Sequence, residues 1–249
     1  MKEFDLKRAG DLAQIVEDDD LLHRIGTYNE RSQHRTLKFV LEEDKSFHEV
    51  QIGPYVADIC RDGQIYEIQT AGFKNLCSKL KFFSEEYAVT VVYPAAAVKT
   101  IVWVDPVSGE LSYGNRVKRN AAKYKLLAEL IHIHEFLDKE QVKILIFETE
   151  VLDYRILDGR GPNKKIKATK SDIVPIDVIS VTEINEARDI RELLKFDENK
   201  EYTRSDIGKT TQLKGRNLSC AIKALVLLGI LDKYKTEKNK VLYKLRAVE

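Results

Sequence analysis

The sequence has 249 residues, which is too long for one ordinary domain of about 100–150 residues and enough for two. Hydrophobic residues make up 43% of it and charged residues 33%, which is typical of a globular protein with an ionic surface rather than of a disordered chain. Lysine and arginine number 41 against 40 aspartates and glutamates. The net charge of +1 therefore does not indicate a polyanionic partner, and any basic surface has to be local.

Hydropathy and cysteine usage point to the cytoplasm. No stretch approaches the ~20 consecutive apolar residues that cross a bilayer, so we expect neither a membrane protein nor a membrane partner. The first residues, MKEFDLKRAGD, contain no apolar segment, so we expect no secretory signal. Cys60, Cys77 and Cys220 are far apart and odd in number. This pattern excludes a disulfide scaffold and a zinc site of the C-x-x-C type, and it fits a reducing compartment.

Charge is distributed unevenly along the chain. Residues 1–20 carry three basic and seven acidic side chains, whereas residues 196–249 carry twelve basic and seven acidic ones. Residues 114–125 and 159–170 each contain five lysines or arginines and no acid. Either basic stretch alone is compatible with a solvated surface. Together with the basic C-terminal part, they predict a polyanionic partner.

Periodicity and turn residues predict a mixed series of helices and strands. The turn Asp62-Gly63 stands between two β-rich runs, which is the strongest short-range hairpin pattern. The predicted helices are 29–43, 73–85, 121–138 and 186–195, and the predicted strands are 47–52, 55–60, 65–70, 88–93, 100–105 and 142–154. Residues 159–170 are interpreted as a polar loop, and Pro175 and residues 197–200 as weak linker signals near a domain boundary at 180–196.

The hairpin at Asp62-Gly63 brings two acids together. If these two residues form the loop, residues whose numbers sum to 125 face each other, so Asp58 faces Glu67 on one side of the sheet, at a Cβ separation of ~4.5–5.5 Å. Gln69 follows on the same face because side chains alternate with period two. Opposed like charges are destabilising, and a divalent cation such as Mg²⁺ would remove the repulsion. A solvent-facing hairpin without metal is the alternative.

The order helix, three-stranded meander, helix, strand resembles the PD-(D/E)xK nucleases, the restriction-endonuclease-like superfamily. Pro54-Tyr55-Val56-Ala57-Asp58 and Glu67-Ile68-Gln69 match its Asp and Glu-x-Lys motifs, with glutamine in the lysine place. The resemblance covers about residues 29–106. It implies a mixed sheet flanked by helices and phosphodiester hydrolysis with Mg²⁺ or Mn²⁺.

The resemblance also implies roles for individual residues. Asp58 and Glu67 would bind the metal with help from the Ile68 carbonyl, Gln69 would position the attacking water, and Glu30 would face the site from the first helix. Glutamine offers only neutral hydrogen bonds where lysine is cationic. The next helix contains three lysines that are candidates to replace that charge: Lys74, Lys79 and Lys81.

The last fifty residues predict a second fold unit. Thr203 caps a short helix to residue 211, with Asp206 at the third helical position, and a turn at 212–215 leads into a helix over 216–228. Strands 230–234 and 241–245 then enclose the basic loop 235–240. This order resembles a winged helix-turn-helix domain over about 187–246.

In such a domain the second helix of the pair enters the major groove of DNA, led by its N-terminal residues. Winged helices also serve as protein-contact modules, and that alternative stays open. The residues expected at DNA are Lys214, Arg216, Asn217, Ser219 and Lys223 at the helix, Lys235, Lys238 and Lys240 in the wing, and Arg116, Lys118 and Arg119 in the first basic stretch.

The sequence thus predicts an α/β protein with an acidic extension (1–28), a nuclease-like domain with a basic middle segment (29–185) and a winged-helix domain (186–249). The predicted function is that of a cytoplasmic, metal-dependent endonuclease docked on duplex DNA. The alternatives are a non-catalytic DNA-binding regulator on a degenerate nuclease scaffold and an RNA-directed nuclease. A homodimer is compatible with the sequence, which does not fix the oligomeric state.

Overall fold

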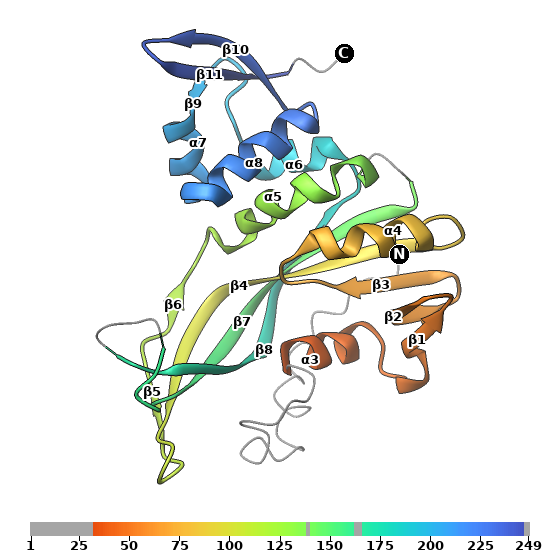
Figure 1. Ribbon diagram of the computed structural model, residues 1–249, viewed down its shortest axis with the longest axis vertical. Coiled ribbons are helices and arrows are strands. Elements are labelled where there is room, and N and C mark those ends of the chain that lie inside the picture. Colours follow the sequence, from red (N-terminus) through yellow and green to blue (C-terminus); the bar gives the residue numbers. More distant parts are fainter. Residues whose placement is uncertain (1–31, 138–139, 162–165, 247–249) are drawn as a thin grey trace. The chain divides into compact units, whose positions relative to one another are not determined.

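The computed structural model describes residues 32–137, 140–161 and 166–246, and it confirms a mixed α/β protein with a large mixed sheet flanked by helices (Figure 1). The chain divides into two compact units, each assembled from separate stretches. Among the described residues, unit 1 comprises those within 32–48, 95–120 and 147–181, and unit 2 those within 49–94, 121–146 and 182–246.

The large sheet has the strand order β1-β2-β3-β4-β7-β8, with β5 and β6 paired to β4. The β2–β3 pair is antiparallel, β3 and β4 are parallel, and β5 and β6 each run antiparallel to β4. The strands are β1 (His48–Ile52), β2 (Tyr55–Arg61), β3 (Gln64–Ile68), β4 (Ala88–Val104), β5 (Leu111–Tyr113), β6 (Val117–Lys118), β7 (Val142–Ile156) and β8 (Thr169–Ile184).

Strand β4 corrects the prediction of two strands at 88–93 and 100–105, because it continues through Pro94 and the three alanines that follow. Proline and alanine are poor strand formers, so the local sequence indicated a break. Contacts with neighbouring strands compensate for this weak local strand preference. Val98 and Lys99 pair with β6, and the Thr149 hydroxyl donates to the Ala95 carbonyl.

Strand β8 was not predicted. Its residues begin within the predicted polar loop 159–170, and Pro175, interpreted as a linker signal, is buried inside the strand. A proline is tolerated in a strand at an edge of a sheet, where one side of the backbone needs no partner. Strand β8 is the last in the strand order and so lies at an edge of the sheet, which explains why it tolerates Pro175.

The helices match the predictions except in the middle of the chain. The predicted helix over 121–138 is wrong as a single helix: four short helical segments replace it, and Ile133 interrupts them with φ −126°. The helical segments before the C-terminal region are α3 (Ser32–Leu41), η2 (Lys45–Phe47), η3 (Phe73–Leu76), α4 (Cys77–Phe83), η4 (Ala122–Lys125), α5 (Leu126–Glu129), η5 (Leu130–His132), η6 (His134–Phe136) and α6 (Ala187–Leu194).

The core of unit 2 includes the inner face of η3 and α4. Phe73, Leu76, Leu80 and Phe83 recur at helical spacing and are all buried. Phe73 packs edge-on against Tyr93 of β4, with ring centroids 6.1 Å apart. This apolar stripe fixes α4 on the sheet and so determines which α4 side chains face the strands.

Unit 1 has its own core and a buried ionic network. Val102, Val104, Tyr154 and Val174 form an apolar cluster between β4, β7 and β8. Fully buried Asp153 of β7 accepts hydrogen bonds from Lys99 Nζ at 2.8 Å and from Arg155 Nη2 at 2.9 Å. The two cations together compensate for burying one carboxylate.

The C-terminal part of unit 2 contains β9 (Tyr202–Thr203), α7 (Arg204–Thr211), α8 (Gly215–Leu227), β10 (Leu231–Glu237) and β11 (Lys240–Leu245). Its three strands have the order β10-β11-β9. Thr203 and Asp206 form the expected capping box of α7. The strands are longer than predicted, because they extend through the predicted basic loop to a turn at Lys238 and Asn239, both with positive φ.

Candidate functional site

The β2–β3 hairpin has the predicted register. Ile59 pairs with Tyr66, Cys60 with Ile65 and Arg61 with Gln64, so the paired numbers sum to 125 as expected. Asp62 and Gly63 form the turn with φ of 50° and 78°. Two left-handed residues in a two-residue loop match the twist of the strands, and aspartate followed by glycine tolerates that conformation.

Asp58 and Glu67 meet just beyond the Ile59–Tyr66 pair, where the ladder ends. The Asp58 backbone N–H donates to Glu67 Oε1 at 3.3 Å, and the Ile68 N–H donates to Asp58 Oδ2 at 2.7 Å. The carboxylates therefore bond to the backbone of the opposite strand. Glu67 is only 2% exposed, while Asp58 is half-buried. The hairpin thus holds two acids side by side, one of them out of water.

Lys79 from α4 compensates for the charge of Glu67. Its ammonium donates to Glu67 Oε1 at 3.0 Å and Oε2 at 2.8 Å. Burial and then the charge of Asp58 raise the pKa of Glu67 to about 7, although the hydrogen bond and charge of Lys79 act in the opposite direction. Two carboxylates and one ammonium therefore lie together at this hairpin.

Of the three candidate lysines, Lys79 is the one whose contact with Glu67 the structure describes. Lys74 and Lys81 are exposed, whereas the Lys79 side chain is 25% exposed. Position 79 lies one helical turn after Leu76 and one turn before Phe83, at the margin of the buried stripe, while position 81 lies on the opposite side. The apolar stripe in the sequence therefore indicates that Lys79 lies beside the buried face of the helix.

Gln69 lies directly after β3 and is held against its own loop. Its backbone N–H donates to the Val92 carbonyl at 2.9 Å, and its side-chain amide donates to the Ala71 carbonyl. The Glu129 carboxylate of α5 accepts from the N–H groups of Gly72 and Phe73 at 3.0 and 3.1 Å. The loop that carries Gln69 is therefore anchored at both ends.

Glu30, predicted to face the site from the first helix, lies outside the described residues. Among the residues that the structure describes, no group of three or more His, Cys, Asp and Glu side chains could hold a metal ion. Mg²⁺ however needs only one or two protein carboxylates, with water and substrate phosphate completing its shell. The buried Glu67 beside Asp58 fits that smaller requirement, provided that Lys79 releases an oxygen of Glu67.

The residues predicted to contact DNA from the α8 region lie on its exposed side. The opposite side packs against α5 (Figure 1) and contains the buried residues Leu218, Ala221 and Leu225. The exposed residues are Lys214, Arg216, Asn217, Ser219 and Lys223. Their exposure agrees with the predicted placement, and their role stays a prediction.

The other basic residues predicted to contact DNA differ in whether they form ion pairs with acids. Lys235 lies 2.9 Å from a Glu237 carboxylate oxygen and 3.6 Å from one of Glu201, whereas Lys238 and Lys240 are exposed at the tip of the hairpin. In unit 1, Arg116 donates through Nε to Glu150 Oε1 at 2.6 Å, and Lys118 and Arg119 are exposed. Lys235 and Arg116 are thus already neutralised by acids.

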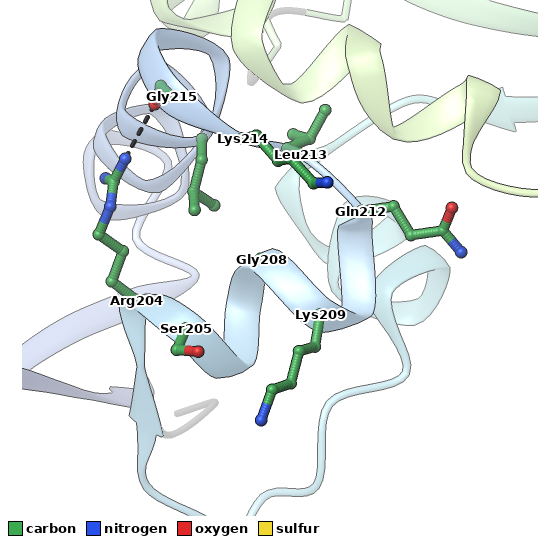
Figure 2. Close-up of a pocket in the computed structure, with 9 residues that line it drawn as sticks. Arg204, Ser205, Gly208, Lys209, Gln212, Leu213, Lys214 and Gly215 are labelled. Carbon is green, nitrogen blue, oxygen red and sulfur yellow. Dashed lines mark hydrogen bonds between the residues drawn. The ribbon is translucent and has the colours of Figure 1, made fainter.

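A cavity of about 650 Å³ lies at the turn between α7 and α8 (Figure 2). The prediction included Lys214 from its lining but missed Arg204 and Lys209, which belong to the first helix of the pair. The lining residues are Arg204, Ser205, Gly208, Lys209, Gln212, Leu213, Lys214, Gly215 and Leu218.

Among the described residues, no helix is both long and apolar enough to span a membrane. A protein of Treponema pallidum (strain Nichols), described as an uncharacterized protein, is 30% identical over 144 residues, which are 57% of this chain and 57% of that protein. This chain therefore spans a little more than half the length of that relative. No solved structure matches the chain.

One family matches residues 31–185, close to the limits of the predicted domain at 29–185. The match covers more than half of the sequence and includes α3, the β2–β3 hairpin and α4. It ends before α7 and α8, so it does not include the cavity at their turn. The chain belongs to the family described as Domain of unknown function (DUF8091).

Proposed function

We propose that this protein is a metal-dependent phosphodiesterase that acts on DNA, with its catalytic centre at Asp58, Glu67 and Lys79. The observation that carries the proposal is the pairing of a buried carboxylate with a second carboxylate across the hairpin, next to one ammonium. Burying a carboxylate beside a second acid is costly for a structural element, and acids with strongly shifted pKa values gather at functional sites.

The proposed roles follow from the chemistry of each group. Asp58 and Glu67 would hold Mg²⁺ or Mn²⁺, which when bound activates water and stabilises charge on a phosphoryl oxygen. Lys79 would supply the positive charge that Gln69 lacks, turning from Glu67 to the phosphate. Gln69 would orient the attacking water through its amide, after releasing the Ala71 carbonyl.

The C-terminal segment would dock the enzyme on duplex DNA. Its element order α6, β9, α7, α8, β10, β11, with β9 paired to β11, supports the resemblance to a winged helix-turn-helix domain. The exposed side of α8 begins with Arg216 and Asn217, whose side chains suit guanine and adenine edges. Lys238 and Lys240 at the hairpin tip suit backbone phosphates.

A plasmid assay tests the proposal. Purified protein with Mg²⁺ or Mn²⁺ should convert supercoiled plasmid to nicked or linear DNA, and Asp58→Asn or Glu67→Gln should abolish the conversion. Asp62→Asn is the matched control, because Asp62 is on the same hairpin, has an 88% exposed side chain and occupies a left-handed position that asparagine tolerates. Equal cleavage by Asp58→Asn and Asp62→Asn would exclude the assigned centre.

One observation favours a second candidate, a non-catalytic DNA-binding regulator. Lys79 already donates to both oxygens of Glu67, so its ammonium can permanently occupy the place that a metal ion would take. Such a protein would bind duplex DNA without binding Mn²⁺ in a calorimetric titration. Preferential competition by RNA over duplex DNA would instead indicate the RNA-directed nuclease.

A further inference from the structure

One peptide group in the loop after β3 is held at both of its ends. The Ala71 carbonyl accepts a hydrogen bond from the Gln69 side-chain amide. The Gly72 N–H, at the opposite edge of the same planar trans peptide, donates to Glu129 Oε2 at 3.0 Å. Gly72 has φ 74°, and the Gln69 amide nitrogen lies 3.9 Å from where a Gly72 Cβ would stand. The Gln69 side chain is therefore folded back on a peptide that Glu129 fixes from the other side.

Glu129 caps this loop from a different element. Its Oε2 also accepts from the Phe73 N–H at 3.1 Å, and Gly72, which precedes η3, has no side chain to cap it. Hydrogen bonds to an ionised acceptor are roughly twice as strong as neutral ones. Burial, and then the charge of Glu129, raise the pKa of the hydroxyl of Tyr93, whose ring packs on Phe73. The carboxylate of Glu129 thus lies close to both the loop and β4.

The core holds Glu129 firmly on its own helix. Leu126, Leu127 and Leu130, which surround it in the sequence, are fully buried. Helix α8 packs against α5 within unit 2 (Figure 1). Glu129 itself is half-buried and ends α5. Because close packing fixes this helix, the carboxylate constrains the loop rather than following it.

The contact with Glu129 affects what Gln69 can do. A charged acceptor on the N–H of a peptide polarises the peptide, so that its carbonyl becomes a stronger acceptor. Glu129 therefore strengthens the hydrogen bond that ties the Gln69 amide to Ala71. The role proposed for Gln69, orientation of the attacking water, requires that this bond be released.

We propose that Glu129 makes an autoinhibitory contact: by holding the Ala71–Gly72 peptide, it keeps the Gln69 amide folded back and away from the attacking water. The inference rests on the proposed function and names a regulation of that same centre. The hydrogen bonds that the structure describes for Glu129 are with loop backbone. Glu129 therefore acts through Gln69 as a positioning residue, and not as a catalytic one.

Plasmid cleavage by the full chain with Mg²⁺ tests this contact through a double-variant cycle. Glu129→Gln keeps the size of the side chain and one acceptor oxygen, but it replaces a charged hydrogen bond with a neutral one. Its single-turnover rate should rise about threefold to tenfold, because Gln69 is released more often. Gln69→Ala should cleave more slowly than the wild type. Adding Glu129→Gln to Gln69→Ala should change nothing further, because no amide is left to release.

Two further variants separate this role from a structural one. Glu135→Gln removes a negative charge from an exposed residue of η6 and should cleave at the wild-type rate. Glu129→Asp keeps the charge on α5 but shortens the side chain, so it should also release Gln69, and it serves as the test if Glu129→Gln does not fold. Cleavage at or below the wild-type rate by a folded Glu129 variant would overturn the inference, as would an equal gain in the Gln69→Ala background.

Solution NMR of the free protein gives a readout that does not depend on cleavage. Glu129→Gln should speed hydrogen exchange of the Gly72 and Phe73 amides, and with them of the Gln69 side-chain amide. Glu135→Gln should exchange like the wild type. Faster exchange at Gly72 and Phe73 with unchanged Gln69 signals refutes the autoinhibitory contact alone. A wild type that does not cleave plasmid refutes the proposed function, while the NMR signals still decide whether Glu129 holds Gln69.

Discussion

Glu67 shows how one buried side chain organises its neighbours. Its carboxylate is buried, its Oε1 accepts a hydrogen bond from the Asp58 N–H, and both of its oxygens accept from the Lys79 ammonium. Strands β2 and β3 and helix α4 therefore meet at these two oxygens. A buried carboxylate without such partners would be costly. The cation that contacts Glu67 comes from α4, and the proposed function assigns to it the charge that Gln69 lacks.

At this residue scale, Lys79→Gln should change metal affinity and cleavage in opposite directions. Removal of the ammonium frees the oxygens of Glu67, so Mn²⁺ affinity measured by calorimetry should rise. Cleavage of plasmid should fall by ~10²–10³, the usual loss when one positioned group is removed from a charged transition state. Lower Mn²⁺ affinity in this variant would contradict competition between the ammonium and the metal for Glu67. Unchanged cleavage would contradict the catalytic role of Lys79.

A second prediction at the residue scale concerns the ionic network of β4 and β7. Asp153 is fully buried between Lys99 and Arg155. Asp153→Ala would leave two cations without their shared carboxylate, and breaking a buried pair typically costs about 3–5 kcal/mol. Urea denaturation at neutral pH measures this loss, and a change below about 1 kcal/mol would contradict the structural importance of the network.

The same carboxylate has a defined pH dependence. Burial raises the pKa of Asp153, but the hydrogen bonds and charges of Arg155 and Lys99 outweigh it and lower the pKa. A folded-state pKa below the unfolded value of about 3.9 means that Asp153 adds stability above that pH and loses it as the pH falls through the folded value. Asp153→Asn should therefore lose less stability than the wild type on acidification below about pH 4.

At the scale of elements, the β10–β11 hairpin and α8 present different chemistry. The hairpin tip offers exposed Lys238 and Lys240, which suit any phosphate, whereas the start of α8 offers Arg216 and Asn217, which suit base edges. Affinity and sequence preference should therefore be separable by mutation, provided that the segment docks on DNA as proposed.

The hairpin variant Lys238→Ala with Lys240→Ala should weaken duplex binding almost equally for all sequences. The salt dependence of binding should flatten by roughly two units, because two phosphate contacts are lost. Arg216→Ala should instead cost about 1–3 kcal/mol on a preferred site only. Fluorescence anisotropy over a panel of duplexes checks both, and a sequence-dependent effect of the hairpin variant would place that hairpin in a groove.

At the scale of the whole molecule, the C-terminal segment is part of unit 2 and not an appendage. Helix α8 packs against α5 and η5, whose Leu126, Leu127 and Leu130 are fully buried. Removing residues 196–249 would expose this apolar surface to water. Point variants are therefore a better test of docking than truncation.

A chain that ends at Lys195 should accordingly lose stability. Its thermal unfolding midpoint should fall well below that of the full chain, and it should bind a hydrophobic dye in native buffer because the α5 surface is uncovered. Differential scanning fluorimetry and dye fluorescence measure the two effects. An unchanged midpoint would show that α5 stays covered without α8, and would make residues 196–249 an independent domain.

The local sequence was sufficient for the hairpin, the caps and the principal helices. Asp62-Gly63 fixes the register of β2 and β3 because only left-handed turn residues fit a two-residue loop, and that register brings Asp58 to Glu67. The capping box at Thr203 and Asp206 and the stripe from Phe73 to Phe83 likewise depend on residues within a few turns of each other. Short-range sterics and hydrogen bonds decide such features.

Tertiary structure alone decided the rest. Strand β4 continues through Pro94 and β8 forms around Pro175, because pairing with distant strands outweighs weak local preference. Lys79 reaches Glu67 only because the packing of α4 fixes its rotation over the sheet. The α7–α8 cavity depends on the angle between two helices, which no local pattern encodes. The two strands depend on partners far apart in sequence, whereas the Lys79 contact and the cavity depend on how neighbouring elements pack, and both kinds of contact exist only once the chain is folded.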